Sequence, residues 1–438
     1  MISQHKQRIV IDALRRGTVP EQGLELFAVG LEKFESAIDE ELSLIEKQGS
    51  VFKAVRGDYG SGKTFFARWL QERARQKGFA VSEVQISESD TPLHKLETIY
   101  RRLVERLSIS SIHSGAFKNI IDSWFYTLEE DILASQDSDK LDEQKLMQLT
   151  NNLMEQRLLK ISRNAPAFAS VLRGYRKAIF SNKHSEANGL IAWLSGQPYV
   201  ASSIKKFAAI KGEIDHFAAL NFLQGLLLIL KDSGHAGLVL VLDEVETLQR
   251  VRTDSRDKAL NALRQLVDEI DAGRFPGLYL LITGSPMFFD GNQGVQRLTP
   301  LAQRLYTDFS THMKFDNPRA VQIRLNGFDL ELLCKLGQTI RNIYAQYSSK
   351  PQRINELAND QYIEKFATAI TGHLGGIIGI APRLFLKKLV GDVLDRIDQF
   401  PDFNPQKDYE LTLVDAEMNE IEKNAQAAKD IDDIELDL

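Results

Sequence analysis

Short apolar runs alternate with longer amphipathic stretches along the middle of the chain, in an order that predicts a parallel α/β fold. The runs typical of buried strands lie at residues 51–56, 79–86, 237–242, 278–282 and 321–325. The third run, Gly-Leu-Val-Leu-Val-Leu, has no polar side chain, as a strand covered on both faces requires. Because parallel strands are joined by helical crossovers, the pattern predicts a sheet with helices on its faces.

The residues between the second and third strands follow a helical pattern. They predict a helix over 91–107, capped by Thr91 with Pro92 in its first turn. They also predict a helical insertion over about 109–215, which is larger than the sheet itself requires.

Helical patterns return after the last strand, at residues 329–347 and 361–399, before the chain becomes polar and ends in an acidic run. The expected organisation is therefore a core over residues 1–325, a helical lid over 326–400 and an acidic tail over 401–438.

Composition narrows the class of protein. A hydrophobic share of 43% and a charged share of 26% are typical of a globular protein. No apolar run reaches the roughly 20 residues of a membrane span, and the N-terminal residues lack the apolar segment of a signal peptide. The single cysteine, Cys334, excludes intrachain disulfides, so we expect a cytoplasmic protein without membrane contact. Because the net charge is −6, any contact with nucleic acid requires a local basic patch.

Residues 57–64 match the phosphate-binding pattern GxxxxGK[ST], known as Walker A. An apolar run precedes this octet and an amphipathic run follows it, which is the strand–loop–helix setting of a P-loop. Glycines let the backbone wrap a phosphate, and the helix N-terminus adds positive potential. The predicted nucleotide-binding residues are Gly57, Asp58, Tyr59, Gly60, Ser61, Gly62, Lys63, Thr64 and Phe65.

Two sets of side chains predict ATP hydrolysis with Mg²⁺. In the octet, Lys63 is expected to reach the β- and γ-phosphates and the Thr64 hydroxyl to hold the metal. The third strand ends in Asp243-Glu244, the Walker B pattern, in which Asp243 holds the metal in its outer shell and Glu244 polarises the attacking water. Glu246 is a weaker auxiliary candidate. The alternative is a strand that simply stops at acidic surface residues.

Further positions resemble those that AAA+ ATPases place around the phosphates. The fourth strand ends at a polar position similar to sensor 1, for which Thr283 is preferred to Ser285. Arg304 lies where these proteins carry an arginine finger aimed at a neighbouring subunit, and Arg297 is its alternative. Arg383 resembles the sensor-2 arginine of the lid. A solvated surface arginine is the other interpretation of each.

An upstream segment resembles the adenine-covering part of related ATPases. Residues 17–20 and 27–32 fall at the corresponding positions. The stretch Val-Gly-Leu-Glu is similar to the "GRE" box of that group, with Leu31 in place of the arginine.

The chain as a whole resembles the BrxD ATP-binding proteins of bacterial BREX phage-defence systems. The resemblance rests on residues 13–20, 52–70, 83–88, 193–196 and 242–246. It implies an AAA+-like ATPase, distantly related to origin-recognition ATPases, whose partners are other BREX proteins. It also implies a host system that separates self from phage DNA by methylation and blocks phage replication. The formation of a homo-oligomer is left open.

A basic stretch in the insertion raises the question of nucleic acid. Residues 156–185 carry seven Lys and Arg and no carboxylate, with aromatic residues between them. A DNA contact is predicted through Arg173, Arg176 and Lys177. The alternative is a solvated helical face whose aromatic residues belong to the core.

The combined motifs predict an AAA+-like P-loop ATPase that couples its nucleotide state to conformational change in a defence complex. One rival is a nucleotide-dependent switch or scaffold with little hydrolysis. A second rival is an ATP-dependent DNA-binding loader. A small-molecule kinase fits less well, because the carboxylate pair and the lid arginine suit hydrolysis.

Overall fold

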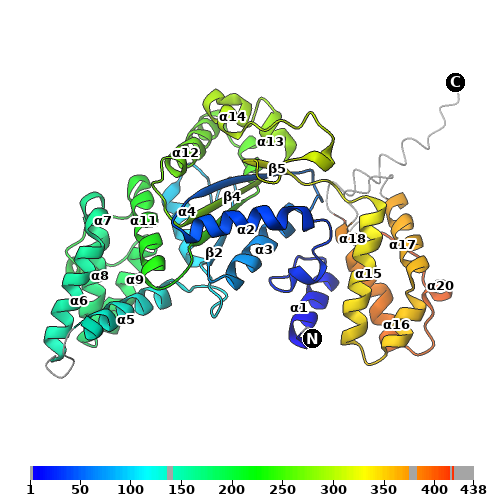
Figure 1. Ribbon diagram of the computed structural model, residues 1–438, viewed down its shortest axis with the longest axis horizontal. Coiled ribbons are helices and arrows are strands. Elements are labelled where there is room, and N and C mark those ends of the chain that lie inside the picture. Colours follow the sequence, from blue (N-terminus) through cyan, green and yellow to red (C-terminus); the bar gives the residue numbers. More distant parts are fainter. Residues whose placement is uncertain (1–2, 136–141, 374–381, 415–416, 419–438) are drawn as a thin grey trace. The chain divides into compact units, whose positions relative to one another are not determined.

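The computed structural model describes residues 3–135, 142–373, 382–414 and 417–418 (Figure 1). Five parallel strands form one sheet in the order β2-β3-β4-β1-β5. Their bounds are β1 Val51–Arg56, β2 Ala80–Gln85, β3 Leu238–Asp243, β4 Leu278–Gly284 and β5 Gln322–Arg324. The predicted α/β fold is confirmed, and each strand lies within two residues of the apolar run that predicted it.

The buried centre of the sheet explains why the apolar runs were informative. All residues of β3 and β4 are buried, so no polar face breaks their apolar pattern. Val84 of β2 pairs with Leu242 of β3, and Leu242 pairs in turn with Ile282 of β4. The register therefore aligns the ends of three neighbouring parallel strands.

The chain divides into two compact units. The first unit comprises Met1–Ile38, Val55–Arg73 and Asp308–Leu438, and the second comprises Asp39–Ala54 and Ala74–Thr307. The predicted boundaries of core, lid and tail stay a prediction, and residues 419–438 of the tail lie outside the described residues.

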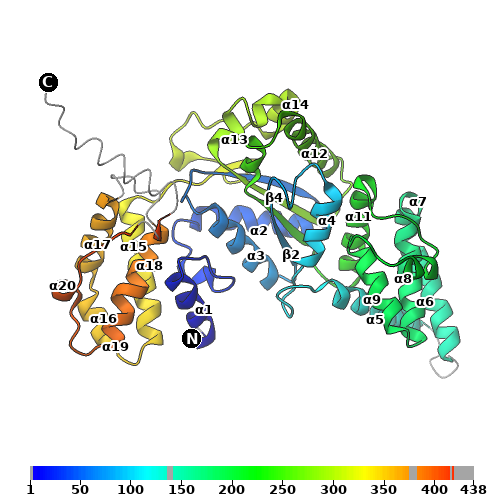
Figure 2. The same cartoon turned by 180° about the vertical axis from the view of Figure 1, so that it is seen from behind.

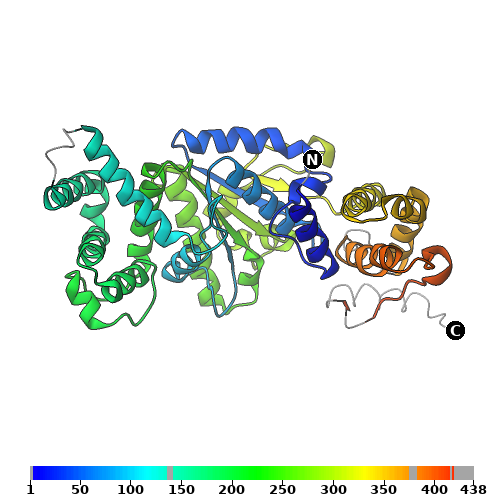
Figure 3. The same ribbon diagram turned by 90° about the horizontal axis from the view of Figure 1, so that it is seen from below.

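The insertion of the second unit is helical, as the sequence predicts (Figure 1, Figure 3). Its helices are α5 Phe117–Ser135, α6 Glu143–Arg157, α7 Leu159–Asn164, α8 Pro166–Phe180, α9 His184–Leu194 and α10 Ser202–Phe207. The next helix, α11 (His216–Asp232), packs against α4 (Leu96–Glu105), as Figure 2 shows. A Cβ on Gly225 of α11 would lie 2.4 Å from the Phe168 ring, so glycine is required where α8 meets α11.

The predicted start of the helix over 91–107 was wrong, because α4 begins only at Leu96. Thr91 does not cap a helix, since its hydroxyl donates to the carbonyl of Gln85. Its backbone N–H donates to Ser87 Oγ at 3.0 Å. A local turn therefore uses the groups that a helix start would have needed.

A buried ion pair within the second unit joins a lysine of β1 to a glutamate of α2 (Glu32–Glu46). Lys53 is 1% exposed and forms an ion pair with Glu41, which also accepts a hydrogen bond from the Tyr279 hydroxyl at 2.7 Å. Burial raises the pKa of Glu41 and lowers the pKa of Lys53. Because each charge compensates the other, removing either one alone would leave an unpaired buried charge.

Helices from the two ends of the chain form a helical body within the first unit, which includes the predicted lid. They are α1 Gln4–Arg15, η1 Leu24–Phe27, α15 Leu330–Tyr347, α16 Pro351–Leu357, α17 Asp360–His373, α18 Pro382–Lys388, η7 Leu389–Leu394, α19 Asp395–Gln399 and α20 Pro405–Asp408. Arg15 donates two hydrogen bonds to Asp395, at 2.6 and 2.8 Å, and the Tyr344 hydroxyl donates a third at 2.7 Å. This network fixes α1 against the lid helices.

The remaining helices lie next to the strands along the sequence or in the connections between strands. They are α2 Glu32–Glu46, α3 Lys63–Gln76, η3 Val245–Gln249, α12 Thr253–Asp271, α13 Pro286–Asp290, η4 Val295–Arg297, α14 Thr299–Leu305 and η5 Met313–Phe315. Within the described ranges, no helix has the length and apolar character needed to cross a membrane.

Candidate functional site

The octet forms a tight loop between β1 and α3, in the first unit. Gly60 and Gly62 have φ angles of 79° and 89°, which other residues adopt only with strain. A Cβ on Gly57 would lie 2.2 Å from Ser61 Oγ and 3.2 Å from the carbonyl oxygen of Leu325. The three glycines are therefore required by the path of the loop.

The polar groups of the octet suit an anionic ligand. Lys63, the first residue of α3, donates from Nζ to the carbonyl oxygens of Gly57 at 2.8 Å and Asp58 at 3.1 Å. The Ser61 hydroxyl is buried and has no hydrogen-bond partner among the described residues. Thr64 lies in the first turn of α3, half-buried. A helix N-terminus, a lysine and an unsatisfied buried hydroxyl together fit a phosphate group.

Helix α3 also holds the N-terminal segment of the first unit. Arg68 donates from Nη1 to the carbonyl of Val19 at 2.7 Å. The Glu72 carboxylate accepts hydrogen bonds from the backbone N–H groups of Gly23 and Leu24, each at 2.7 Å. Sequence reasoning missed both side chains. The signal was present, because Arg68 and Glu72 follow Thr64 at successive four-residue intervals and so share one helix face.

The predicted adenine segment lies against the lid within the first unit. Gly17 has a φ of 70°, and a Cβ placed on it would lie 3.3 Å from Cδ of Lys387 and 3.5 Å from Nη1 of Arg383. Phe27 meets the Phe65 ring edge-to-face at 5.1 Å. These contacts bring the segment, α3 and α18 together, while its contact with adenine stays a prediction.

Arg383 lies in the first turn of α18 and donates from Nη2 to the carbonyl of Glu417 at 2.8 Å. The Arg383 guanidinium also lies next to Gly17, the first residue of the predicted adenine segment. Residues 376–381, the first part of the run that resembles sensor 2, lie outside the described residues.

The acidic turn, Asp243–Thr247, follows β3 in the second unit. Asp243 is buried and accepts a hydrogen bond from the Thr283 hydroxyl. The backbone N–H of Glu244 donates to the same hydroxyl oxygen at 3.1 Å. Thr283, fully buried at the end of β4, thus joins the two acidic residues. Ser285, the second choice for this position, instead caps α13.

Glu244 occupies a strained position. Its φ and ψ are 61° and 42°, in the left-handed region that a residue with a side chain adopts at a cost of about 1–3 kcal/mol. Its Oε2 accepts a hydrogen bond from Gln85 Nε2 at 2.8 Å. Gln85 is the last residue of β2 and pairs in register with Asp243, so the neighbouring strand supplies the contact. Sequence reasoning missed Gln85, although its place at the end of a parallel strand was a usable signal.

The two arginine-finger candidates both bind carboxylates of α12. Arg297 donates from Nη2 to Asp257 Oδ2 at 3.1 Å, and this contact raises the arginine pKa and lowers that of Asp257. Arg304 forms an ion pair with Asp268 and donates to the carbonyl of Pro300 at 3.0 Å. A role of either residue in a neighbouring subunit stays a prediction.

The basic residues singled out in the insertion do not form one exposed surface. Arg173 forms an ion pair with Glu155 at 2.8 Å. Arg176 is buried and forms an ion pair with Glu129 at 2.6 Å. Lys177 alone of the three is exposed without an ion pair among the described residues.

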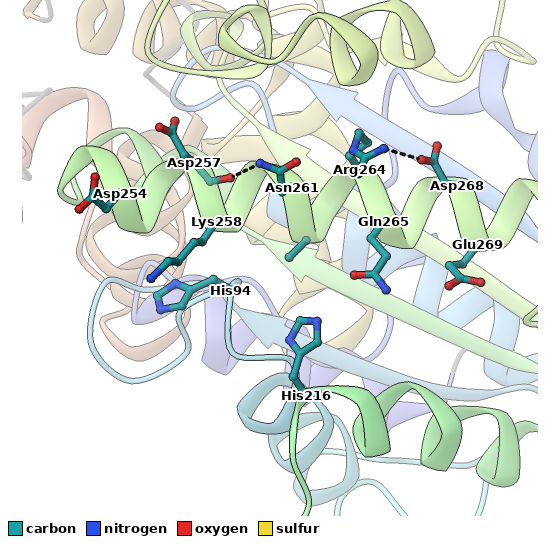
Figure 4. Close-up of a pocket in the computed structure, with 11 residues that line it drawn as sticks. His94, His216, Asp254, Asp257, Lys258, Asn261, Arg264, Gln265, Asp268 and Glu269 are labelled. Atoms are coloured by element: carbon teal, nitrogen blue, oxygen red, sulfur yellow. Dashed lines mark hydrogen bonds and ion pairs between the residues drawn. The ribbon is translucent and has the colours of Figure 1, made fainter. Parts of the chain in front are cut away.

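A polar cavity of about 930 Å³ lies along α12 (Figure 4). Lys258 and Gln265 extend toward it from the helix, and His94 and His216 face them. Burial and the neighbouring lysines lower the pKa of His94. None of the predicted site residues lines this cavity. Across the part of the chain that the structure describes, no group of three or more His, Cys, Asp or Glu is arranged to hold a metal ion.

Comparison with known proteins agrees with the phosphate-binding loop. A search of curated proteins returned no match. The family described as BREX system ATP-binding protein BrxC/D matches residues 2–413, nearly the whole chain. The earlier resemblance is thereby confirmed, and ATP is the nucleotide that this family binds. The chain belongs to the BrxC/BrxD family of ATP-binding proteins of the BREX defence system.

Proposed function

We propose that this ATP-binding protein hydrolyses ATP with Mg²⁺ and passes the resulting conformational change to other BREX proteins. The observation that carries hydrolysis is the acidic turn, where a strained Glu244 is held from two sides by Thr283 and Gln85. Strain of this kind persists only where the surrounding contacts fix it, and it is concentrated at functional positions.

The octet supplies the groups that hold the triphosphate. Lys63 gives a charge that can leave the loop carbonyls for phosphate oxygens, and the Ser61 hydroxyl gains a partner. Thr64 would hold Mg²⁺ through its hydroxyl oxygen, a hard donor of the kind that this ion prefers, and Asp243 would act in the outer shell of the metal. When bound, the metal neutralises charge that develops on the phosphates.

In the hydrolytic step Glu244 orients a water and accepts its proton as the water attacks the γ-phosphate. The γ-phosphate–oxygen bond to ADP breaks, and ADP and phosphate leave. Gln85 and Thr283 act as positioning residues, because they fix the side chain and backbone of Glu244. This assignment makes Thr283 a support of the acidic turn, in addition to its proposed place as sensor 1.

The first unit supplies a route from nucleotide to conformation. Arg383 lies next to Gly17, within the proposed adenine segment. Helix α3 contacts the N-terminal residues around this segment through Arg68 and Glu72. A nucleotide held by the octet would therefore influence the positions of both α3 and the lid helix α18. Loss of the γ-phosphate would alter these contacts and shift the lid. Arg304 is the proposed finger if copies of the chain assemble.

Phosphate release by the full chain tests the proposal. We expect release that requires Mg²⁺, stops with a chelator, and falls sharply in Glu244→Gln, which keeps the size of the side chain. Glu143→Gln, at an exposed position of α6, is the matched control and should retain turnover close to that of the wild type. Equal turnover in wild type and Glu244→Gln would remove Glu244 from the proposed role.

The switch or scaffold alternative rests on one specific observation. The carboxylate of Glu244 accepts a hydrogen bond from Gln85 through Oε2, and a switch would use this contact to hold the carboxylate away from an attacking water. ATP binding without turnover, alone and with BREX partners, would favour the switch.

A further inference from the structure

One end of the insertion carries a group of lysines around a single aromatic ring. Phe207, the last residue of α10, has Lys183 Nζ at 5.3 Å and Lys177 Nζ at 5.8 Å from its ring centroid. Lys205 and Lys206 precede it in the last turn of α10, and Lys211 follows. We call these five lysines the lysine cluster.

Close helix packing fixes the cluster in place. A Cβ on Gly174 of α8 would lie 2.9 Å from Cβ of Ala208, and a Cβ on Gly189 of α9 would lie 2.9 Å from Ile204. The two glycines therefore let the α10 region approach α8 and α9 closely. Lysines from separate parts of the chain are thus held together by buried contacts.

The charge of the cluster is not compensated within the described residues. None of its five lysines forms an ion pair there, and all but Lys205 are exposed. Residues 174–215 contain six Lys and Arg and three carboxylates, Glu186, Glu213 and Asp215, in a chain whose net charge is −6. Such a concentration of like charge repels itself, which an anionic partner would relieve.

Other cations of the insertion behave differently. Arg157, Arg173 and Arg176 each form an ion pair with a carboxylate of another helix. What distinguishes the lysine cluster is that five cations without an ion pair among the described residues gather on the surface formed by α10, the end of α8 and the turn before α9. Lysine is the residue type throughout, and its compact ammonium suits phosphate oxygens without a fixed geometry.

Exposed aromatic side chains indicate which kind of polyanion fits this surface. Phe180, the last residue of α8, is 42% exposed, and Tyr199, in the loop before α10, is 91% exposed. Tyr199 has a φ of 62°, and its N–H donates to Glu213 at 3.1 Å. Exposed rings on the segments that also carry the lysines fit nucleic acid, where bases stack and phosphates bind cations.

We propose that the lysine cluster binds the phosphate backbone of a nucleic acid without reading its sequence. This surface is separate from the ATP chemistry and does not depend on it. Of the residues expected to contact DNA from the sequence, it retains only Lys177.

Fluorescence anisotropy with the full chain and labelled DNA, single-stranded and duplex, tests the proposal over a range of salt. The test variant is the triple Lys183→Ala, Lys206→Ala and Lys211→Ala. The matched control is the triple Lys47→Ala, Lys145→Ala and Lys231→Ala, which removes the same charge from exposed positions elsewhere in the second unit. ATP turnover and thermal midpoint confirm that both variants are folded.

We expect the test triple to weaken DNA binding about tenfold or more at moderate salt. The slope of log affinity against log salt should fall by about 3, whereas the control should stay close to wild type. Wild type that binds no DNA, or two triples that lose affinity equally, would overturn the proposal. Binding of anionic vesicles or polyglutamate in place of DNA would also overturn it.

Discussion

The octet of the first unit and the acidic turn of the second are held in shape by different means. The octet depends on backbone, with Gly60 and Gly62 at positive φ and Gly57 against Ser61. The acidic turn depends on side chains, because Thr283 binds Asp243 and the backbone N–H of Glu244, and Gln85 binds the Glu244 carboxylate.

This difference predicts different consequences of mutation. Backbone requirements appear in the sequence as glycines at fixed spacing, so the octet is recognisable by inspection. Side-chain contacts between strands leave no local pattern. Changes in the octet should therefore remove ATP binding, and changes around the acidic turn should remove turnover while ATP still binds.

The largest loss of binding is expected from Lys63→Ala. The substitution removes the charge that we propose binds the β- and γ-phosphates, and we expect ATP affinity to fall about 100-fold or more. Calorimetry of ATP binding measures the effect. Lys47→Ala, at an exposed position, is the matched control, and full affinity in Lys63→Ala would sink the assignment of the octet.

Gly57→Ala tests the backbone requirement directly. Its Cβ would lie 2.2 Å from Ser61 Oγ, so the loop must shift and ATP binding should fall about tenfold or more. Gly372→Ala, in a helix where nothing lies within 4 Å of the new Cβ, should leave binding intact and raise stability by about 0.5–1 kcal/mol. Equal ATP affinity of the two variants would show that ATP binding does not require glycine at position 57.

The strands and the start of α4 show how far the fold could be predicted from the sequence. Strands β3 and β4 were predictable because each is an apolar run buried in the sheet. The start of α4 was not, because Ser87 and the carbonyl of Gln85 bind the groups of Thr91 that suggested a cap. Local patterns give elements, whereas competition between neighbouring polar groups decides where the elements begin.

The site shows the same division. Lys63, Asp243 and Glu244 were proposed from motifs, whereas Gln85, which contacts Glu244 from another strand, was missed. The basic stretch misled for a similar reason. Its own residues lack carboxylates, yet Glu155 and Glu129 reach Arg173 and Arg176 from helices α6 and α5.

Thr283→Val should have an intermediate effect. Valine keeps the shape but leaves Asp243 and the N–H of Glu244 without the hydroxyl, which should cost about 1–3 kcal/mol of stability. We expect turnover to fall more than ATP affinity. Thr283→Ser restores the hydroxyl and should recover turnover; if serine and valine behave alike, the hydroxyl does not support the turn.

Gln85→Ala should have the smallest effect. One hydrogen bond to Glu244 is lost at an exposed position, and turnover should fall about two- to tenfold with ATP affinity unchanged. Gln85→Glu places two carboxylates together and should reduce turnover further. Steady-state phosphate release measures both, and an unaffected Gln85→Glu would exclude the contact from the working site.

The central proposal is that Glu244 orients the water that hydrolyses the ATP held by the octet. Its most direct test is the identity of the nucleotide retained after incubation with Mg²⁺ and ATP and rapid removal of free ligand. We predict that wild type retains ADP, whereas Glu244→Gln retains ATP in comparable amount. Intact ATP on both proteins, or ADP on both, would contradict the account.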